Sequence, residues 1–272
     1  MPFAKVNDIN MYYEIHGEGE PLIIINGAGA TVEFLYPSVP VYSKDNQLII
    51  YDHRNNGKSD KSDKPLSMEL LADDAAGLLD AIDIESAHVR GMSMGGAIAQ
   101  HLALRHPQRI KSLVLGCTSS QLSSTYTHAI PPTPECLEIF DTEKTRKMTP
   151  EEFGIKITRL QMTEDYENNH PALFKQMSEA IASDSQRWIQ TLAEQTQVPH
   201  DTYDRLPDIH LPTLVIAGNA DKMIPYQNSE IIASRIPNAE LSIIDGAGHT
   251  FIEAREEADR VTLGFIKRHS NK

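Results

Sequence analysis

Short hydrophobic runs alternate with amphipathic segments along most of this chain. Runs rich in Ile, Val and Leu predict β-strands, which we expect at Phe3–Val6, Asn10–Ile15, Leu22–Ile25, Leu48–Tyr51, His88–Gly91, Leu113–Leu115, Thr213–Ala217 and Leu241–Ile244. Apolar residues spaced three and four apart predict helices at Met68–Leu79, Met94–Arg105, Gln227–Arg235 and Glu256–Arg268. Strands that alternate with helices predict a mostly parallel sheet covered on both faces. Only the opening hairpin, turned by Asn7-Asp8, is expected to be antiparallel.

The alternation breaks between residues 120 and 210, which predicts a separate helical segment. Several prolines lie near its start. Helices are then expected to begin at Thr149-Pro150-Glu151-Glu152, after His170 and after Asp184. At the first of these, threonine suits the cap, proline the first turn and glutamate a capping box. We therefore expect a helical cap at 120–210, inserted into a core domain formed by 1–119 and 211–272.

The stretch Gly91-Met92-Ser93-Met94-Gly95 has the pattern G-x-S-x-G between a predicted strand and a predicted helix. A strand that turns directly into a helix through this pattern raises the serine hydroxyl above the sheet edge. The glycines keep side chains out of the crowded turn, and the helix N-terminus favours negative charge nearby. We predict that Ser93 is a catalytic nucleophile.

Two later loops carry the partners that such a serine requires. A buried-strand pattern from Leu214 ends in a loop that presents Asp221, and the strand ending at Ile244 leads to a loop carrying His249. A serine hydroxyl needs an imidazole to take its proton, and a carboxylate orients that imidazole. Asp245, four residues before His249, is an alternative acid, but we favour Asp221.

The chain order Ser93, Asp221, His249 resembles that of the α/β-hydrolases. The resemblance is to the cofactor-free group that contains carboxylesterases, 3-oxoadipate enol-lactonases, perhydrolase-type haloperoxidases and polyketide methylesterases. It covers nearly the whole chain, through residues 22–29, 51–59, 91–96, 212–225 and 245–249. It implies an α/β-hydrolase fold with a mostly parallel eight-stranded sheet flanked by helices, and neither a cofactor nor a metal. Many members carry His-Gly after the third strand, whereas Asn26-Gly27 here is closer to the enol-lactonase branch.

Two backbone N–H groups are candidates for an oxyanion hole. In this fold one donor follows the nucleophile, which here is Met94. The resemblance points to Ala28 as the other donor, in the loop after the third strand. Gly27 and Gly29 on either side of it let the backbone pass close to a substrate. One such donor is worth roughly 3 kcal/mol of the reaction barrier.

Composition restricts the class of protein. The chain has 272 residues, enough for one large α/β domain with an insertion. Its formal net charge of −13 argues against nucleic-acid binding, which needs clustered Lys and Arg. The start lacks the apolar core of a signal peptide, and no apolar stretch approaches the roughly 18 residues of a membrane span. Cys117 and Cys136 lack metal-ligand spacing, so we expect free thiols in a cytoplasmic protein.

The favoured function is hydrolysis of carboxylic esters or lactones of a small molecule through an acyl-enzyme on Ser93. Serine at this position disfavours haloalkane dehalogenases and epoxide hydrolases, whose resemblance would require aspartate. Two alternatives stay open, namely a carbon–carbon bond hydrolase of a vinylogous diketone and a ligand-binding receptor that turns over slowly. We expect neither nucleic-acid nor membrane partners, and the sequence leaves the substrate and the oligomeric state open.

Two other side chains have competing interpretations. Trp188, on the last predicted cap helix, either anchors the cap to the core or faces the substrate pocket, and we favour the anchor. His53 lies between Asp52 and Arg54, which resembles a catalytic pair, but we expect it to make structural hydrogen bonds.

Overall fold

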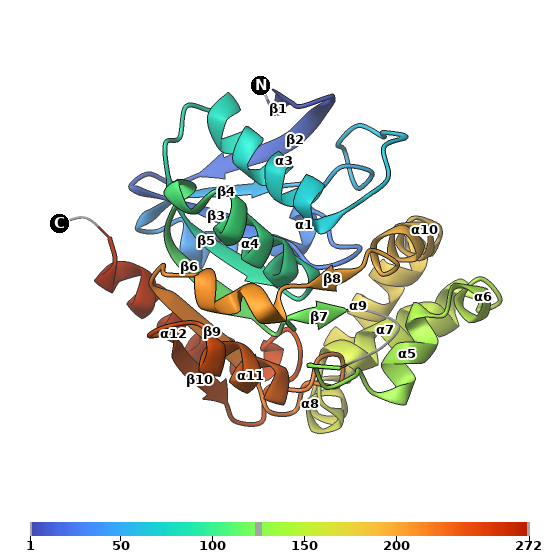
Figure 1. The fold of residues 1–272 in the computed structure, drawn as a ribbon. Helices are drawn as coiled ribbons and strands as arrows, with labels where there is room; N and C mark the ends of the chain where they lie inside the picture. The colour runs from blue at the N-terminus through green and yellow to red at the C-terminus, as the bar shows by residue number, and fades with distance from the viewer. Residues whose placement is uncertain (1, 123–126, 271–272) are drawn as a thin grey trace.

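An eight-stranded sheet forms the centre of the computed structural model, which describes residues 2–122 and 127–270 (Figure 1). Its strands are β1 (Phe3–Val6), β2 (Ile9–His16), β3 (Glu20–Ile25), β4 (Asn46–Tyr51), β5 (Ala87–Met92), β6 (Ile110–Gly116), β9 (Thr213–Gly218) and β10 (Glu240–Ile244). They lie in the order β1-β2-β4-β3-β5-β6-β9-β10. β2 is antiparallel to both of its neighbours, and all other neighbouring strands are parallel. The predicted mostly parallel sheet with an antiparallel opening hairpin is confirmed.

The strands lie close to their predicted positions because both faces of the sheet are buried. Leu22 and Ile24 of β3 pack into one apolar cluster, while Ile23 and Ile25 pack into the cluster on the opposite face. Alternate side chains of a strand point to opposite faces, so a continuous apolar run is the pattern of a strand that is covered on both sides.

Helices cover both faces of this sheet (Figure 1). They are α1 (Val32–Leu35), α2 (Val39–Tyr42), α3 (Met68–Ala81), α4 (Met94–Arg105), α11 (Gln227–Arg235) and α12 (Arg255–Arg268), with short 3-10 helices η1 (Pro107–Arg109), η2 (Tyr203–Asp208) and η3 (Ile252–Ala254). Apolar residues of α3, α4 and α11 join the cluster of Ile23, and those of α12 join the cluster of Leu22. Across the described ranges, no helix is long and apolar enough to cross a membrane.

Between β6 and β9 the chain forms a group of helices, which we call the helical segment. It contains α5 (Pro134–Phe140), α6 (Thr142–Thr145), α7 (Pro150–Gln161), α8 (Glu164–Asn169), α9 (Pro171–Ser183) and α10 (Ser185–Gln195). Figure 1 shows these helices gathered to one side of the sheet. The predicted starts at Thr149, His170 and Asp184 are found, and the predicted capping box of Thr149 and Glu152 is present.

The helical segment has an apolar cluster of its own, which includes Phe153, Ile157 and Trp188. Two short strands that were not predicted, β7 (Gln121–Leu122) and β8 (His200–Asp201), pair antiparallel where the chain enters and leaves the segment. A strand of two residues is too short to produce a recognisable alternation. The division of the chain into a cap and a core domain stays a prediction.

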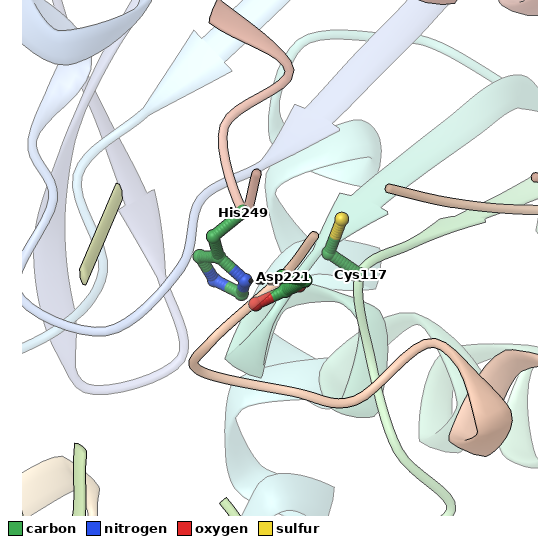
Figure 2. Close-up of side chains that lie close together, drawn as sticks. All are labelled: Cys117, Asp221 and His249. Carbon is green, nitrogen blue, oxygen red and sulfur yellow. Dashed lines mark hydrogen bonds and ion pairs between the residues drawn. The ribbon is translucent and has the colours of Figure 1, made fainter. Parts of the chain in front are cut away.

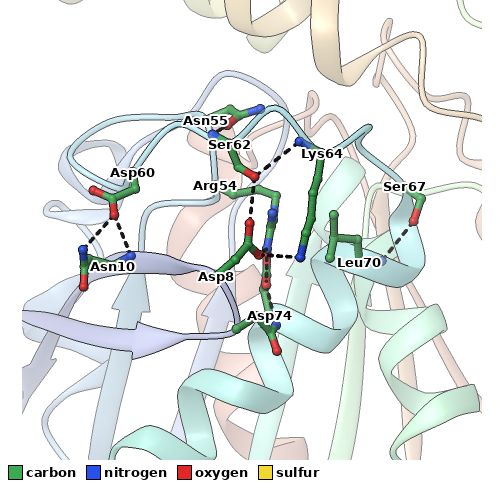
Figure 3. Close-up of polar contacts among 11 residues, drawn as sticks. Asp8, Asn10, Arg54, Asn55, Asp60, Ser62, Lys64, Ser67, Leu70 and Asp74 are labelled. Atoms are coloured by element: carbon green, nitrogen blue, oxygen red, sulfur yellow. Dashed lines mark hydrogen bonds and ion pairs between the residues drawn. The ribbon is translucent and has the colours of Figure 1, made fainter.

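A buried ion pair fixes the loop after β4 (Figure 3). Arg54 donates to Asp74 of α3 at 2.5 and 2.7 Å, and to Asp8 of the β1–β2 turn at 3.2 Å. Ser62 donates to Asp8 at 2.9 Å, and the Lys64 ammonium lies 3.1 Å from it. These two contacts hold the pKa of Asp8 well below its usual range. The loop is thereby tied to two other elements, and it supports the site described next.

Candidate active site

Ser93 is the single residue between β5 and α4, as the sequence predicts. Its backbone has φ 56° and ψ −123°, a combination that residues other than glycine rarely adopt. Two hydrogen bonds hold this conformation, because Ser93 N donates to Gly116 O at 2.9 Å and Thr118 Oγ1 donates to Ser93 O at 2.8 Å. The strained turn places Ser93 in the lining of a cavity.

Glycines on both sides make this turn sterically possible. A Cβ on Gly95 would lie 2.1 Å from the carbonyl oxygen of Ile25, and one on Gly91 would lie 2.2 Å from that of Gly95. Neither position has room for a side chain, so both glycines are required by close backbone approach. Gly27 also lies beside the serine, since a Cβ there would lie 3.2 Å from Ser93 Cβ.

His249 and Asp221 form a buried pair at the ends of two neighbouring strands (Figure 2). His249 Nδ1 lies 2.7 Å from Asp221 Oδ2, while Asp221 Oδ1 accepts hydrogen bonds from Met223 N at 2.7 Å and Ile224 N at 2.9 Å. These backbone bonds fix the carboxylate. Because an ionised carboxylate only accepts hydrogen bonds, the proton of this bond lies on Nδ1, which in the neutral form of the ring leaves Nε2 with a lone pair. That tautomer is the one a general base requires.

The loop that carries His249 is held by the helical segment. Glu253 accepts from Gly248 N at 2.9 Å with one carboxylate oxygen and from Thr163 N at 2.6 Å with the other. Thr250 Oγ1 donates to the carbonyl oxygen of Gln161, the last residue of α7, at 3.1 Å. The position of the imidazole therefore depends on the end of α7 as well as on the sheet.

Of the predicted triad, His249 and Asp221 are hydrogen-bonded to each other. Asp245, the alternative acid, accepts from Asn219 Nδ2 at 2.7 Å in an exposed contact and makes no hydrogen bond to His249. The geometry thus favours Asp221 as the orienting acid. Ser93 Oγ makes no hydrogen bond within 3.5 Å to His249 in the part of the chain that the structure describes. In unliganded sites this bond is often long and tightens when substrate binds.

Cys117 lies against the buried pair (Figure 2). It follows β6 with φ 43°, is fully buried, and its sulfur lies within 4.8 Å of the nearest oxygen of Asp221 and the nearest ring nitrogen of His249. Burial and the negative charge of Asp221 raise the pKa of this thiol well above its ordinary value. The thiol therefore stays protonated, which makes it a poor nucleophile and a poor metal ligand. Cys117 and Cys136 are both free, as predicted.

The loop after β3 forms a tight turn beside Ser93. Ala30 N donates to the carbonyl oxygen of Gly27 at 3.3 Å, and Gly29 has φ 74°, the positive value that a type II turn requires at its third position. Because the Gly27 carbonyl points into the turn, the N–H of Ala28 in the same trans peptide points away from it. Neither Ala28 N nor Met94 N donates a hydrogen bond within the described residues. Both predicted oxyanion donors thus lack a protein acceptor among the described residues.

The loop after β4 also contacts this turn. His53 Nε2 donates to the carbonyl oxygen of Asn26 at 3.0 Å, and Asn56 Nδ2 donates to that of Ala30 at 2.7 Å. Burial lowers the pKa of His53, so the ring is neutral at neutral pH. The contact is between the imidazole and backbone, which agrees with the structural role expected for His53.

Helix α10 of the helical segment holds the same turn from the other side. Arg187 Nη1 donates to the carbonyl oxygen of Gly29 at 2.9 Å and to Asn56 Oδ1 at 2.7 Å, and Gln195 Oε1 accepts from Gly29 N at 2.8 Å. The ring of Trp188 packs on Gly29 so closely that a Cβ there would lie 2.5 Å from Cε3. The buried Trp188 ring is therefore a contact between the helical segment and the turn, as the favoured interpretation expects.

A cavity of about 60 Å³ lies over these residues. Its lining consists of Ala28, Met68, Ser93, Met94, Ala97, Thr118, Ser119, Leu122, Pro132, Phe140, Gln195, Thr196, His200, Met223 and Ile224. Three of the predicted site residues, Ser93, Ala28 and Met94, belong to this lining, whereas the His249–Asp221 pair does not. Because the lining is mostly apolar with a few polar groups, it has the character of a small-molecule site.

Sequence reasoning missed Arg187, Gln195 and Asn56 as contributors to the site. A polar residue on an amphipathic helix is normally solvated, so its type alone carries no signal. One usable signal was spacing, because Gln195 follows Trp188 by seven residues and therefore lies on the same face of α10. If that tryptophan contacts the core, the glutamine two turns later contacts it too.

Fold and site together define a class of protein. The model of the α/β hydrolase fold family matches residues 20–255. The chain belongs to this α/β hydrolase fold family, which confirms the fold class expected from the sequence.

Individual relatives and a solved structure agree with this membership. A putative carbamate hydrolase RutD of Azorhizobium caulinodans is 30% identical, over 97% of this chain and 98% of the relative. A poly(3-hydroxyalkanoate) depolymerase of Ectopseudomonas oleovorans is 32% identical, over 88% of this chain and 81% of the relative. The structure of an enol-lactonase from Burkholderia xenovorans LB400 has a TM-score of 0.83 at 24% identity, covering 98% of this chain and 100% of that one. At that identity the last comparison supports the fold alone.

Proposed function

We propose that this chain is a serine hydrolase that cleaves carboxylic ester or lactone bonds of a small molecule through an acyl-enzyme on Ser93. The observation that carries this proposal is the strained Ser93, which lines a cavity together with Ala28 and Met94. The unoccupied N–H groups of those two residues support an oxyanion hole, and the buried Asp221–His249 pair supports a general base.

In this mechanism Ser93 Oγ attacks the carbonyl carbon while His249 Nε2 takes the hydroxyl proton. Asp221 keeps Nδ1 in place and stabilises the imidazolium that forms. The N–H groups of Ala28 and Met94 donate to the carbonyl oxygen as its negative charge develops. The imidazolium then gives its proton to the leaving oxygen, and the acyl group stays on the serine. Water, deprotonated by the same Nε2, finally releases the acid and restores the serine hydroxyl.

Carbamate hydrolysis is a second candidate, favoured by the relative from Azorhizobium caulinodans, whose name describes a putative carbamate hydrolase. A carbamate presents the same carbonyl carbon and leaving oxygen as an ester, with nitrogen on the acyl side. The same residues would form a carbamoyl group on Ser93 and then release it to water. The polyester-cleaving name of the second relative agrees with the ester alternative.

A substrate panel combined with a fluorophosphonate probe tests the proposal. The panel contains short p-nitrophenyl esters, a small lactone, an aryl carbamate and a vinylogous diketone. Multiple turnovers of an ester or lactone, with probe labelling at Ser93, are expected. Preferential turnover of the carbamate would establish the second candidate. Turnover of the diketone alone would indicate a carbon–carbon bond hydrolase, and labelling without any turnover would indicate a receptor.

A further inference from the structure

We propose that Gln195 is a substrate-recognition residue, whose side-chain N–H donates a hydrogen bond to a second acceptor atom on an uncharged acyl group. This inference rests on the proposed function, because it assigns the acyl group that Ser93 would hold. The cavity lined by Ser93 also has Gln195 in its lining. An acyl group bonded to the serine oxygen would therefore share this cavity with the Gln195 side chain.

The orientation of the Gln195 amide follows from its partner. Gly29 N lies 2.8 Å from the side chain and can only donate, so the atom facing it is the carbonyl oxygen Oε1. The amide nitrogen Nε2 then points elsewhere. Gln195 as a whole is only 1% exposed, and its Nε2 is buried. This nitrogen has no hydrogen-bond partner among the described residues. A buried donor without an acceptor is destabilising unless a ligand satisfies it.

The other polar side chains of the cavity are already engaged by the protein. Thr118 Oγ1 donates to Ser93 O, Ser119 Oγ donates to Gln121 O at 2.9 Å, and Thr196 Oγ1 donates to Leu192 O at 2.7 Å. Besides these three hydroxyls, Ser93 and Gln195, the lining contains the polar ring of His200.

His200 uses both of its ring nitrogens. Nε2 donates to the carbonyl oxygen of Ser119 at 3.0 Å, and Nδ1 lies 3.1 Å from His101 Nε2. Of the polar side chains in the lining, Ser93 and Gln195 are therefore the two that have a donor group without an acceptor among the described residues. One is the proposed nucleophile, and the other is the proposed donor to the acyl group on that nucleophile.

Charge and size restrict the acyl group. The lining contains no Lys, Arg, Asp or Glu side chain, and burial lowers the pKa of His200 to about 4, so this ring is neutral. An anionic or cationic acyl group would be buried there without a counter-ion, which is strongly unfavourable. A cavity of about 60 Å³ is small and has room for only a few water-sized groups. The preferred acyl group is thus small, uncharged and equipped with one acceptor, such as an ether or carbonyl oxygen.

Gln195 also positions the turn through Gly29 N, so the test must separate recognition from positioning. Gln195→Met removes the donor at similar volume. Arg187→Met removes the other α10 contact to the turn, at the Gly29 carbonyl, and leaves the glutamine in place. Gln190→Met makes the same chemical change at an exposed position of the same helix and serves as the surface control.

The probes are p-nitrophenyl methoxyacetate and p-nitrophenyl butyrate, which differ only by an ether oxygen in place of a methylene. The measured quantity is the ratio of kcat/KM for methoxyacetate to that for butyrate, so intrinsic reactivity cancels between variants. Gln195→Met should lower this ratio by about fivefold relative to the wild type. Gln190→Met should leave the ratio unchanged, and Arg187→Met should lower both values of kcat/KM by the same factor.

A ratio in Gln195→Met equal to that of the wild type would overturn the inference while leaving the proposed function intact. An equal fall of the ratio in Arg187→Met would also overturn it, because the effect would then come from the turn. A wild type that hydrolyses neither ester and is not labelled at Ser93 by a fluorophosphonate would instead contradict the proposed function, and this inference with it.

Discussion

Ser93 adopts a backbone conformation that serine rarely takes, and its neighbours make that conformation possible. Gly91 and Gly95 leave room for carbonyl oxygens that approach within about 2 Å of where a Cβ would be. Sterics permit only glycine at these two positions. The pattern G-x-S-x-G was therefore informative at the level of single residues. The partners of the serine were less constrained, since Asp221 and Asp245 are both acids near a loop that carries His249.

Replacing Ser93 by alanine should abolish nearly all hydrolytic activity. The methyl group is smaller than the serine side chain, so thermal unfolding should stay cooperative. Steady-state kinetics on a short p-nitrophenyl ester measure the loss. Retention of more than about one per cent of the wild-type kcat would contradict the role of Ser93 as nucleophile, given the size of losses at catalytic triads.

The Asp221→Asn substitution should lower kcat by about 10⁴-fold, since the amide favours the wrong imidazole tautomer. Asp245→Asn is the matched control, because its carboxylate bonds to Asn219 rather than to His249. We expect that control to keep most of the wild-type kcat. The opposite outcome, with Asp245→Asn damaging and Asp221→Asn mild, would assign the acid to Asp245.

At the scale of elements, α10 shows where prediction from sequence succeeds and where it stops. The helix start after Asp184 was predictable, because the apolar spacing that follows it is helical. That its tryptophan and glutamine meet the turn at Gly29 was not predictable, because the two segments are far apart in the chain. A single sequence shows the periodicity within each element, but it gives no information on which elements lie close together in space. The short helices α6 and α8 were missed for another reason, since one or two turns give no measurable period.

Trp188→Ala should lower the free energy of unfolding by roughly 3–5 kcal/mol, because it leaves a cavity between α10 and the turn. The same substitution should change kcat/KM for long and short esters by the same factor. Urea unfolding measures the first effect, with Gln190→Ala on the exposed face of α10 as control. Unchanged unfolding together with an altered preference between long and short esters would place Trp188 in the pocket instead.

At the scale of the whole molecule, the parallel part of the sheet was the most predictable feature, because both of its faces are buried. All eight predicted strands of the whole sheet are present, and the site residues follow at the ends of strands, where open α/β sheets place their sites. The cavity itself was not predictable, because its shape depends on how the helical segment packs against the core. Substrate choice depends on that shape, which explains why the sequence left the substrate open.

Stability should fall as the pH is lowered from about 6.5 to about 4. Burial lowers the pKa of His88 and of His200 to about 4, below their ordinary value of 6.5. Between these values the unfolded chain binds more protons than the folded one, so the free energy of unfolding decreases with decreasing pH. Each ring contributes at most roughly 3 kcal/mol to this loss.

Urea unfolding at pH 7 and pH 5 tests this dependence. His88→Gln and His200→Gln should each show a smaller difference between the two pH values than the wild type does. His88 is bonded to Ser112 in the core, outside the cavity lining, so its variant separates stability from substrate binding. Equal stability of the wild type at both values would contradict the sign of these pKa shifts.

The central claim is that a covalent acyl group forms on Ser93 during turnover. The most direct measurement is to mix the protein with p-nitrophenyl butyrate, quench with acid within the first turnover, and map the modified peptide by mass spectrometry. The account predicts a butyryl group on the peptide that contains Ser93, absent from the Ser93→Ala variant. Steady turnover of the ester with no acyl group on this peptide, or with the group on another residue, would contradict it.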